Sequence, residues 1–387
     1  MARCTDRLLR PGRGRPQLRP LRRPHRFAQS RPSGKSYRRS TVDPAPLVLK
    51  GFSVPPTIIY LGNDSDAVAN RLKHYQELAR EVGQVDFKFA DKEWPLDQLA
   101  EQCGDTRAIM LATPFDGIVD LARRLPNLKL VQIGSAGANW IDVEGLAGLG
   151  VRVSDNNGAN AVPVAEHTMA LILALYRHLE DLFNNVRRGD WAADHRSGAM
   201  PFPTLTGKRV GIIGLGRIGS RVARRLSGWD CDVVFHDIRT FDQDYLDHSG
   251  VRPLPLDQLL SSSDVVTVHV PLDRTTEKLI SSRELALMKK SAVLINTCRG
   301  PVVDETALIQ ALQEKRLWGA GLDVTEVEPI ADDNPLLSLP NVIITPHLAT
   351  LSPEGGALAA HHIAINTARV ALGREPTSVV RLPGATS

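Results

Sequence analysis

From residue 55 onward, short apolar and β-branched runs alternate with stretches in which apolar residues recur at helical spacing. Such alternation predicts buried strands of a parallel sheet, with helices covering both of its faces. We therefore predict an α/β domain in the first half of the chain. Its strand candidates are PPTIIYLG (55–62), VDFKFA (85–90), AIMLAT (108–113), LKLVQIG (128–134) and VRVSD (151–155).

A long helical stretch follows at residues 162–189, and its first half is apolar around most of the circumference. A helix of this kind usually packs between domains or subunits. A second series of strand candidates then alternates with helices, and residues 352–376 form a last helical stretch. This pattern predicts a second, complete doubly wound sheet. Its candidates are KRVGIIG (208–214), CDVVFHD (231–237), VVTVHV (265–270), AVLINTC (292–298), GAGLDV (319–324) and NVIITPH (341–347).

The segment GLGRIG (214–219) lies between the first strand of this second series and the helix after it. Alone the pattern is weak, but a dinucleotide site also requires an acidic residue about 20 positions later. Asp237 meets this requirement, 18 residues past Gly219. Gly214 would make the tight turn, Gly216 would let a pyrophosphate approach the helix N-terminus, and Gly219 would allow close packing. The segment therefore predicts a nucleotide site.

The same acidic residue bears on the choice of cofactor. Asp237 would accept hydrogen bonds from the adenosine ribose hydroxyls, and its charge would repel a 2′-phosphate, which favours NAD over NADP. Arg239, two residues later, weakens this preference. Without the glycine loop, Asp237 would be read as an ordinary strand-end residue.

Three groups suited to redox chemistry on an anionic substrate follow strands of the second series: Arg299, Glu328 and His347. The carboxyl ends of the strands face the cofactor crevice in this fold, so the three side chains are expected to converge. An arginine binds carboxylates through its fork, and a histidine transfers protons near neutral pH. Each residue alone also has a structural interpretation. Arg299 would form an ion pair, Glu328 would be a solvated loop carboxylate, and His347 would simply end a strand.

Together these motifs resemble the D-isomer-specific 2-hydroxyacid dehydrogenases, a family that includes phosphoglycerate dehydrogenases and glyoxylate/hydroxypyruvate reductases. The resemblance runs from about residue 55 to residue 377. The motifs occur in the family's order and spacing, which is far more specific than any one of them. They are GLGRIG with its downstream Asp, VPLDRTTEKLI (270–280), INTCRGPVVDE (295–305), GAGLDVTEVEP (319–329) and NVIITPH.

The resemblance implies an NAD-dependent enzyme in which Arg299 anchors the substrate, His347 is the acid/base and Glu328 is its catalytic partner. Glu328 would favour the imidazolium and fix the tautomer of His347. Asp323 would lie by the nicotinamide amide, while His167 is interpreted as structural. The remaining cofactor-site residues implied by the resemblance are Arg217, Ile218, Pro271, Thr276, Thr297 and Cys298.

The resemblance also implies a domain arrangement. A Rossmann NAD domain (158–347) would be inserted in a flavodoxin-like substrate domain made of residues 51–157 and 348–387. It further implies a homodimer built on the long helical stretch.

Two substrate loops depart from the family pattern. The frequent GxGxD turn is SAGAN here (135–139), and the backbone amides of Ala136 and Gly137 would still hold a carboxylate. Thr113 is also expected to bind the substrate, but the loop that begins there lacks the arginine that phosphoglycerate dehydrogenases place at this point. We therefore predict a small unphosphorylated substrate such as glyoxylate or hydroxypyruvate. Phosphoglycerate dehydrogenase activity is the alternative, and the reaction's physiological direction stays open.

Charge is distributed very unevenly along the chain. Residues 1–42 hold twelve arginines and Lys35 against Asp6, a net +12 that leaves about −8 on the remainder of a chain with a total of +4. A basic nucleic-acid face on the folded body therefore loses its main support. The Arg- and Pro-rich tail (1–50) is predicted to be disordered.

Three interpretations of this tail remain open: an unstructured extension, an arm for acidic partners, and an organellar transit peptide, which the five prolines within residues 11–32 oppose. The tail also keeps one rival function open, a non-catalytic NAD-sensing protein like the corepressors that share this family's motifs.

The four cysteines lie far apart without metal-ligand spacing, and His361 and His362 have no metal-partner pattern. We predict no metal site and reduced thiols. No apolar run reaches the length of a membrane span and no secretory signal is visible, so we expect a cytoplasmic protein, or an organellar one if the tail is a transit peptide.

Overall fold

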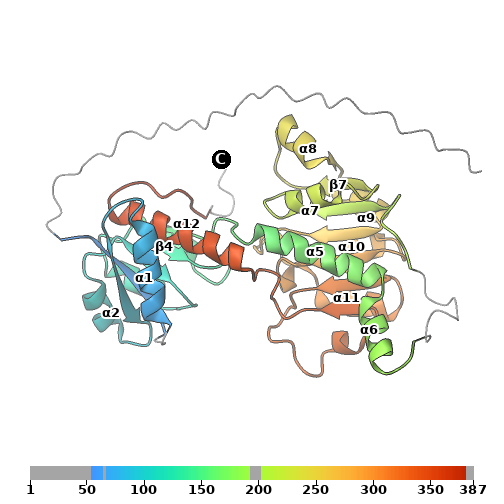
Figure 1. Cartoon of the computed structure of the whole chain (residues 1–387), viewed down its shortest axis with the longest axis horizontal. Coiled ribbons are helices and arrows are strands. Elements are labelled where there is room, and N and C mark those ends of the chain that lie inside the picture. Colours follow the sequence, from blue (N-terminus) through green and yellow to red (C-terminus); the bar gives the residue numbers. More distant parts are fainter. Residues whose placement is uncertain (1–53, 64–66, 192–201, 381–387) are drawn as a thin grey trace, which may run out of the picture. The chain divides into compact units, whose positions relative to one another are not determined.

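The computed structural model describes residues 54–63, 67–191 and 202–380, which form two parallel sheets with helices on their faces (Figure 1). Each apolar run that was predicted to be a strand is one. The fold class expected from the sequence is therefore confirmed. The tail at residues 1–50, for which the sequence predicts disorder, lies outside the described residues.

The first sheet has five parallel strands in the order β2-β1-β3-β4-β5, the flavodoxin-like order. Alternate residues of each strand point to opposite faces, so Ile58 and Tyr60 enter one core while Ile59 and Leu61 enter the other. Burial on both faces explains why these strands read as continuous apolar runs. The strands are β1 (Thr57–Gly62), β2 (Asp86–Asp91), β3 (Ala108–Leu111), β4 (Leu130–Ile133) and β5 (Arg152–Ser154).

Helices from both ends of the described chain cover this sheet. On one face, α1 (Val68–Ala79) packs against α12 (Pro353–Ala371), which also contacts β3 and β4. The N-terminus of α12 is capped by Ser352, whose hydroxyl accepts a hydrogen bond from Gly355 N at 2.8 Å. The other face is covered by α2 (Leu96–Cys103), α3 (Ile118–Arg123) and α4 (Val143–Gly148).

The second sheet has seven parallel strands in the order β12-β11-β10-β9-β6-β7-β8, which is the Rossmann order with one further strand at the β12 edge. Six of them were predicted, and the two-residue strand β8 was not because it is too short to show a period. The strands are β6 (Arg209–Ile213), β7 (Asp232–His236), β8 (Arg252–Pro253), β9 (Val265–Val268), β10 (Val293–Asn296), β11 (Gly319–Leu322) and β12 (Val342–Ile344).

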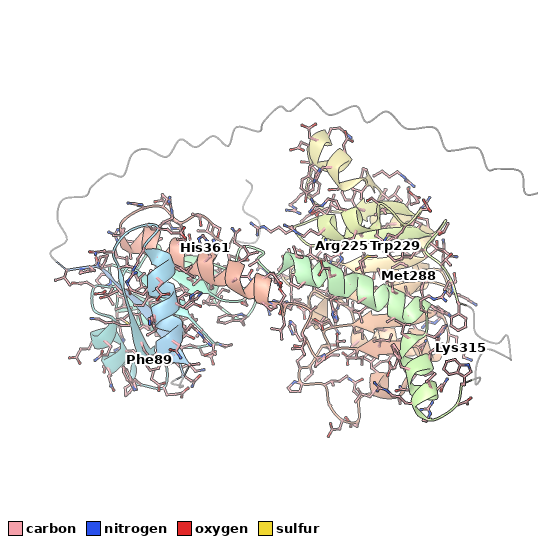
Figure 2. All side chains as sticks on the ribbon, in the orientation of Figure 1. Phe89, Arg225, Trp229, Met288, Lys315 and His361 are labelled. Atoms are coloured by element: carbon pink, nitrogen blue, oxygen red, sulfur yellow. The ribbon has the colours of Figure 1, made fainter. Side chains whose placement is uncertain are left out.

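Helices also cover both faces of the second sheet. Residues of α5 (Ala161–Tyr176) and α7 (Gly219–Leu226) share one core, and residues of α9 (Leu256–Ser262), α10 (Ser282–Leu287) and α11 (Glu305–Gln313) share the other. Met288, labelled in Figure 2, is buried in the second of these cores. The helix α8 (Gln243–Ser249) lies between β7 and β8 in the chain.

The long helical stretch differs from its prediction, because it is two helices rather than one. After α5, His178 adopts a left-handed backbone conformation with φ 48°, and α6 (Leu179–Arg187) begins at the next residue. The His178 ring packs edge-on against Trp318 and Phe202, with centroids 5.5 and 5.3 Å away. These tertiary contacts accompany a break that helical periodicity does not reveal. No helix among the described residues is both long and apolar enough to cross a bilayer.

Candidate active site

The glycine loop between β6 and α7 has the geometry of a phosphate cradle. A Cβ on Gly214, where φ is +93°, would lie 2.6 Å from the carbonyl oxygen of His269, and one on Gly219 would collide with the carbonyl of Gly214. Gly216 differs, because its nearest neighbour would be an Arg239 nitrogen at 3.7 Å. The loop is thus closely packed at its two ends and open in its middle, at the N-terminus of α7, as a dinucleotide pyrophosphate requires.

Asp237 follows β7 and faces this loop. Its Oδ2 accepts a hydrogen bond from Leu215 N at 2.8 Å, and Arg239 pairs with both carboxylate oxygens at 3.2 and 3.1 Å. Burial raises the pKa of the Asp237 carboxyl, but the hydrogen bonds from Arg239 and Leu215 outweigh it and lower that pKa overall. The Arg239 guanidinium also lies over the Phe241 ring, 5.0 Å from its centroid. Loop and carboxylate together fit the adenosine half of NAD.

The other residues implied for the cofactor lie at the same edge of the second sheet. Thr276 closes the loop after β9, where its hydroxyl donates to the carbonyl oxygen of Pro271 at 2.6 Å. Thr297 and Cys298 follow β10 and are buried. Burial raises the pKa of the Cys298 thiol to about 11, so this thiol stays protonated at neutral pH. Two further residues lie in the glycine loop: Ile218 directly precedes α7, and Arg217 bonds Asn157.

His347 and Glu328 form a hydrogen-bonded pair. The distance from His347 Nδ1 to Glu328 Oε2 is 2.7 Å, and each side chain is a little over one third exposed. A carboxylate can only accept, so Nδ1 carries the proton and Nε2 is left for a substrate. Glu328 is held in turn, because its Oε1 accepts from Thr325 N at 3.1 Å. The pair is arranged as a general acid/base with an orienting partner.

Arg299 is oriented by three neighbours. Its Nε donates to Asn139 Oδ1 at 3.1 Å and its NH1 donates to the carbonyl oxygen of Cys298 at 2.7 Å. Gly137 lies so close that a Cβ there would overlap the guanidinium. Because Asn139 is neutral, it fixes the plane of Arg299 without cancelling its charge. The guanidinium therefore remains available to an anionic ligand.

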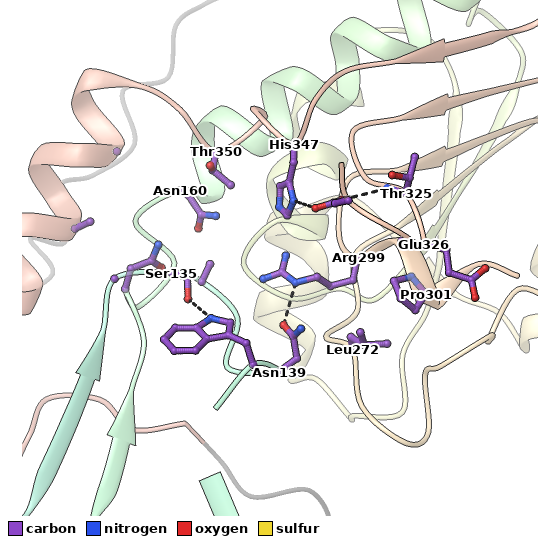
Figure 3. Close-up of a pocket in the computed structure, with 18 of the residues that line it drawn as sticks. Ser135, Asn139, Asn160, Leu272, Arg299, Pro301, Thr325, Glu326, His347 and Thr350 are labelled. Carbon is purple, nitrogen blue, oxygen red and sulfur yellow. Dashed lines mark hydrogen bonds and ion pairs between the residues drawn. The ribbon is translucent and has the colours of Figure 1, made fainter. Parts of the chain in front are cut away.

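One cavity of about 760 Å³ brings these groups together (Figure 3). It is lined by all three residues expected to be catalytic and by Ala136. Thr113 is not among its lining residues, although the sequence suggested it for substrate binding, and its hydroxyl is buried without a partner among the described residues. Arg299 is the one permanently charged cation among the lining residues.

Several lining residues were missed in the sequence reasoning: Trp140, Asn156, Asn160, Leu272 and Thr350. Trp140 closes the substrate turn by donating from Nε1 to the Ser135 hydroxyl at 3.1 Å. The Oδ1 atom of Asn160, directly before α5, is buried and has no partner among the described residues. The cluster of asparagines at the start of the long helical stretch was the available signal. Within the described ranges, no three His, Cys, Asp or Glu residues are placed to hold a metal ion.

Comparisons with known proteins show which proteins this chain resembles. A family model described as D-isomer specific 2-hydroxyacid dehydrogenase, NAD binding domain, matches residues 169–349. The chain is 36% identical to a glyoxylate reductase of Thermofilum pendens, over 75% of this chain and 86% of that protein. It is 35% identical to a glycerate dehydrogenase of Methylorubrum extorquens, over 76% of this chain and 92% of that protein.

The chain is also similar in three dimensions to a solved structure. The fold matches that of a glyoxylate reductase from Paecilomyes thermophila with a TM-score of 0.73 and 26% sequence identity. The match covers 84% of this chain and 99% of that chain.

Proposed function

The chain belongs to the D-isomer-specific 2-hydroxyacid dehydrogenase family, and from this premise we propose that it interconverts small, unphosphorylated 2-oxo acids and D-2-hydroxy acids with NAD as its preferred cofactor. The observation that carries the proposal is the position of the Glu328–His347 pair and Arg299 in a single cavity. The pair supplies proton transfer, and the arginine supplies a site for the substrate's carboxylate.

Each residue has a distinct role in this proposal. Arg299 binds the carboxylate and the oxo oxygen of the substrate, and the backbone amide of Ala136, which also lines the cavity, binds the carboxylate. NADH, held by the glycine loop and Asp237, would supply the hydride that reduces C2 of the substrate. His347 donates a proton from Nε2 to the oxo oxygen, and Glu328 orients the imidazole for this transfer through its hydrogen bond with Nδ1. In oxidation, the neutral imidazole removes the hydroxyl proton.

The preference for unphosphorylated acids rests on the charges that line the cavity. Arg299 is the single permanent cation there and is needed for the carboxylate, while Glu326 and Glu328 are acidic. A phosphate ester would therefore lie near carboxylates without a second cation to pair with. Comparing kcat/KM for glyoxylate, hydroxypyruvate and 3-phosphohydroxypyruvate tests the proposal. The alternative, a D-3-phosphoglycerate dehydrogenase, requires the phosphorylated acid to be the best of the three.

We expect NADH to bind more tightly than NADPH. A 2′-phosphate beside the Asp237 carboxylate is a like-charge contact that costs several kcal/mol, and Arg239 offsets part of it, so the expected difference in Kd is about tenfold. Titrating both reduced cofactors by fluorescence measures this ratio. The Asp237→Ser variant should reduce the ratio of the Kd of NADPH to that of NADH. Equal or tighter binding of NADPH by the unmodified protein would contradict the assignment of Asp237.

We also propose a homodimer, supported by an exposed apolar stripe on α6. Leu179, Phe183 and Val186 follow each other at helical spacing and are 37%, 63% and 50% exposed. Apolar side chains that are exposed to water gain free energy when a partner covers them. Such a stripe is therefore typical of a protein–protein interface. The same helix has Glu180 and Asp181 in its first turn and Arg187 in its last. A two-fold axis across α6 would place two copies antiparallel, so that the acidic end of each helix would lie beside the basic end of the other.

Replacement of Phe183 by Glu is expected to convert the dimer to a monomer, because it places a charge in the middle of the apolar stripe. Light scattering after size-exclusion chromatography gives the mass directly. Leu358→Glu is the matched control, since Leu358 is 58% exposed on α12. A monomeric unmodified protein, or a Phe183→Glu variant that stays dimeric, would rule out this interface.

A cytoplasmic location belongs to the proposal as well. Cys103, Cys231 and Cys298 are free thiols in the described part of the chain and support it, because reduced thiols are usual in the cytosol.

A further inference from the structure

The backbone of the catalytic histidine is held in an uncommon conformation. His347 has φ 56°, in the left-handed region that residues with a Cβ rarely adopt. Its backbone N donates to the carbonyl oxygen of Asp323 at 2.8 Å. Residues in such conformations persist where the surrounding structure fixes them. The contacts that fix His347 therefore bear on where its Nε2 points.

The Asp323 carboxylate accepts hydrogen bonds from residues on both sides of His347. Its Oδ1 accepts from the Thr345 hydroxyl at 2.6 Å and from Leu348 N at 3.0 Å, and its Oδ2 accepts from Ala349 N at 2.9 Å. The carboxylate is almost fully buried, with 1% of its side chain exposed. Buried carboxylates require such donors, and these donors come from the loop that carries the histidine.

His167, from α5, extends this arrangement. Its Nε2 lies 2.9 Å from the Thr345 hydroxyl and 3.6 Å from Asp323 Oδ1. The Thr345 hydroxyl has one proton, which it donates to the carboxylate, so it can only accept from His167. The proton of His167 is therefore on Nε2. A continuous chain of donors runs from His167 through Thr345 to Asp323, and the network is cooperative.

The residue after His167 anchors the other half of the site. The Thr168 hydroxyl lies 3.0 Å from that of Thr297, two residues before Arg299, and both side chains are buried. Two consecutive residues of α5 thus contact the loops that carry the acid/base histidine and the substrate arginine. The helix α5 therefore links two loops that are both remote from it in sequence.

We propose that His167 and Thr345 are positioning residues that act through Asp323 to hold His347 in its catalytic orientation. The inference rests on the proposed function, since it concerns the histidine that transfers the proton there. It differs from the structural interpretation of His167, because it ties this side chain to the rate of the reaction. Neither residue lines the substrate cavity, so binding of the substrate should be little affected.

The Thr345→Val variant tests the proposal, because valine keeps the shape of the side chain and removes the hydroxyl. We expect kcat for 2-oxo acid reduction to fall about 10- to 100-fold, as for a small misplacement of a catalytic group, with little change in KM or in the Kd of NADH. Thr345→Ser restores the hydroxyl and should restore most of kcat. Unchanged kcat in Thr345→Val, or an equal loss in Thr345→Ser, would overturn the proposal.

A second measurement does not depend on turnover. In protein with ¹⁵N-labelled histidine imidazoles, we expect a slowly exchanging Nε2–H for His167, identified by its absence in His167→Gln and lost in Thr345→Val. A His167 protonated on Nδ1 alone would contradict the donor chain. If the unmodified protein reduced no 2-oxo acid, the proposed function would fail. The spectrum would still show whether the hydrogen bonds from His167 through Thr345 to Asp323 exist.

Discussion

Replacement of His347 by glutamine is expected to lower kcat for 2-oxo acid reduction by about 10³-fold, because general acid catalysis by a positioned side chain contributes 10²- to 10⁴-fold. Glutamine keeps a polar group of similar length but does not donate a proton to the developing alkoxide. The Kd of NADH should change little, because in the proposed function the glycine loop and Asp237 hold the adenosine half of the cofactor, away from His347. Steady-state rates and a fluorescence titration of NADH measure the two quantities separately.

The matched control is His361→Gln. His361 lies on α12, labelled in Figure 2, where its Nε2 is 3.1 Å from Glu81, and it does not line the cavity. Its replacement should leave kcat unchanged. Near-normal turnover in His347→Gln would remove the histidine from the mechanism. The result also separates the enzyme from the NAD-sensing interaction protein, whose partner binding does not need His347 as a proton donor.

Replacement of Arg299 by alanine is expected to lower kcat/KM for 2-oxo acids by about 10³-fold, since removing one partner of a close charge pair costs 2–5 kcal/mol. Lysine keeps the charge but not the fork that spans carboxylate and oxo oxygen, so Arg299→Lys should recover only part of the activity. The loss should appear in KM as well as in kcat, because in the proposed function the arginine binds the substrate both before and during the reaction.

Arg316→Lys is the control for this experiment, because Arg316 pairs with Glu314 at 2.8 Å away from the cavity. Its kinetics should match those of the unmodified protein. Full activity in Arg299→Lys would show that charge alone suffices and that the oriented fork is unnecessary. An unchanged KM in Arg299→Ala would place the substrate carboxylate elsewhere.

Much of the fold was predictable because its strands are buried on both faces. Ile58 and Ile59, for example, enter opposite cores, so β1 reads as one apolar run with a helix before the next strand. The break at His178 was not predictable, since rings distant in sequence pack against the residue there. The strand β8 was missed because a two-residue strand carries no period.

In the candidate site, the three residues expected to be catalytic were predictable from the sequence, whereas the walls of the cavity were not. Arg299, Glu328 and His347 follow strands whose carboxyl ends lie at one edge of the sheet, so the sequence order alone brings them together. The cavity walls depend instead on loop conformation, which the residue pattern does not encode. Trp140 reaches the cavity through its bond to Ser135, whereas Thr113, on another loop of the first sheet, is not among the lining residues.

The configuration of the product shows whether the protein makes D-2-hydroxy acids. The unmodified protein would be incubated with hydroxypyruvate and NADH, the NADH consumed would be measured, and the glycerate formed would be resolved by chiral chromatography. We predict D-glycerate in an amount equal to the NADH consumed. Formation of the L-isomer, or no consumption of NADH with hydroxypyruvate, glyoxylate or any other 2-oxo acid, would contradict the account.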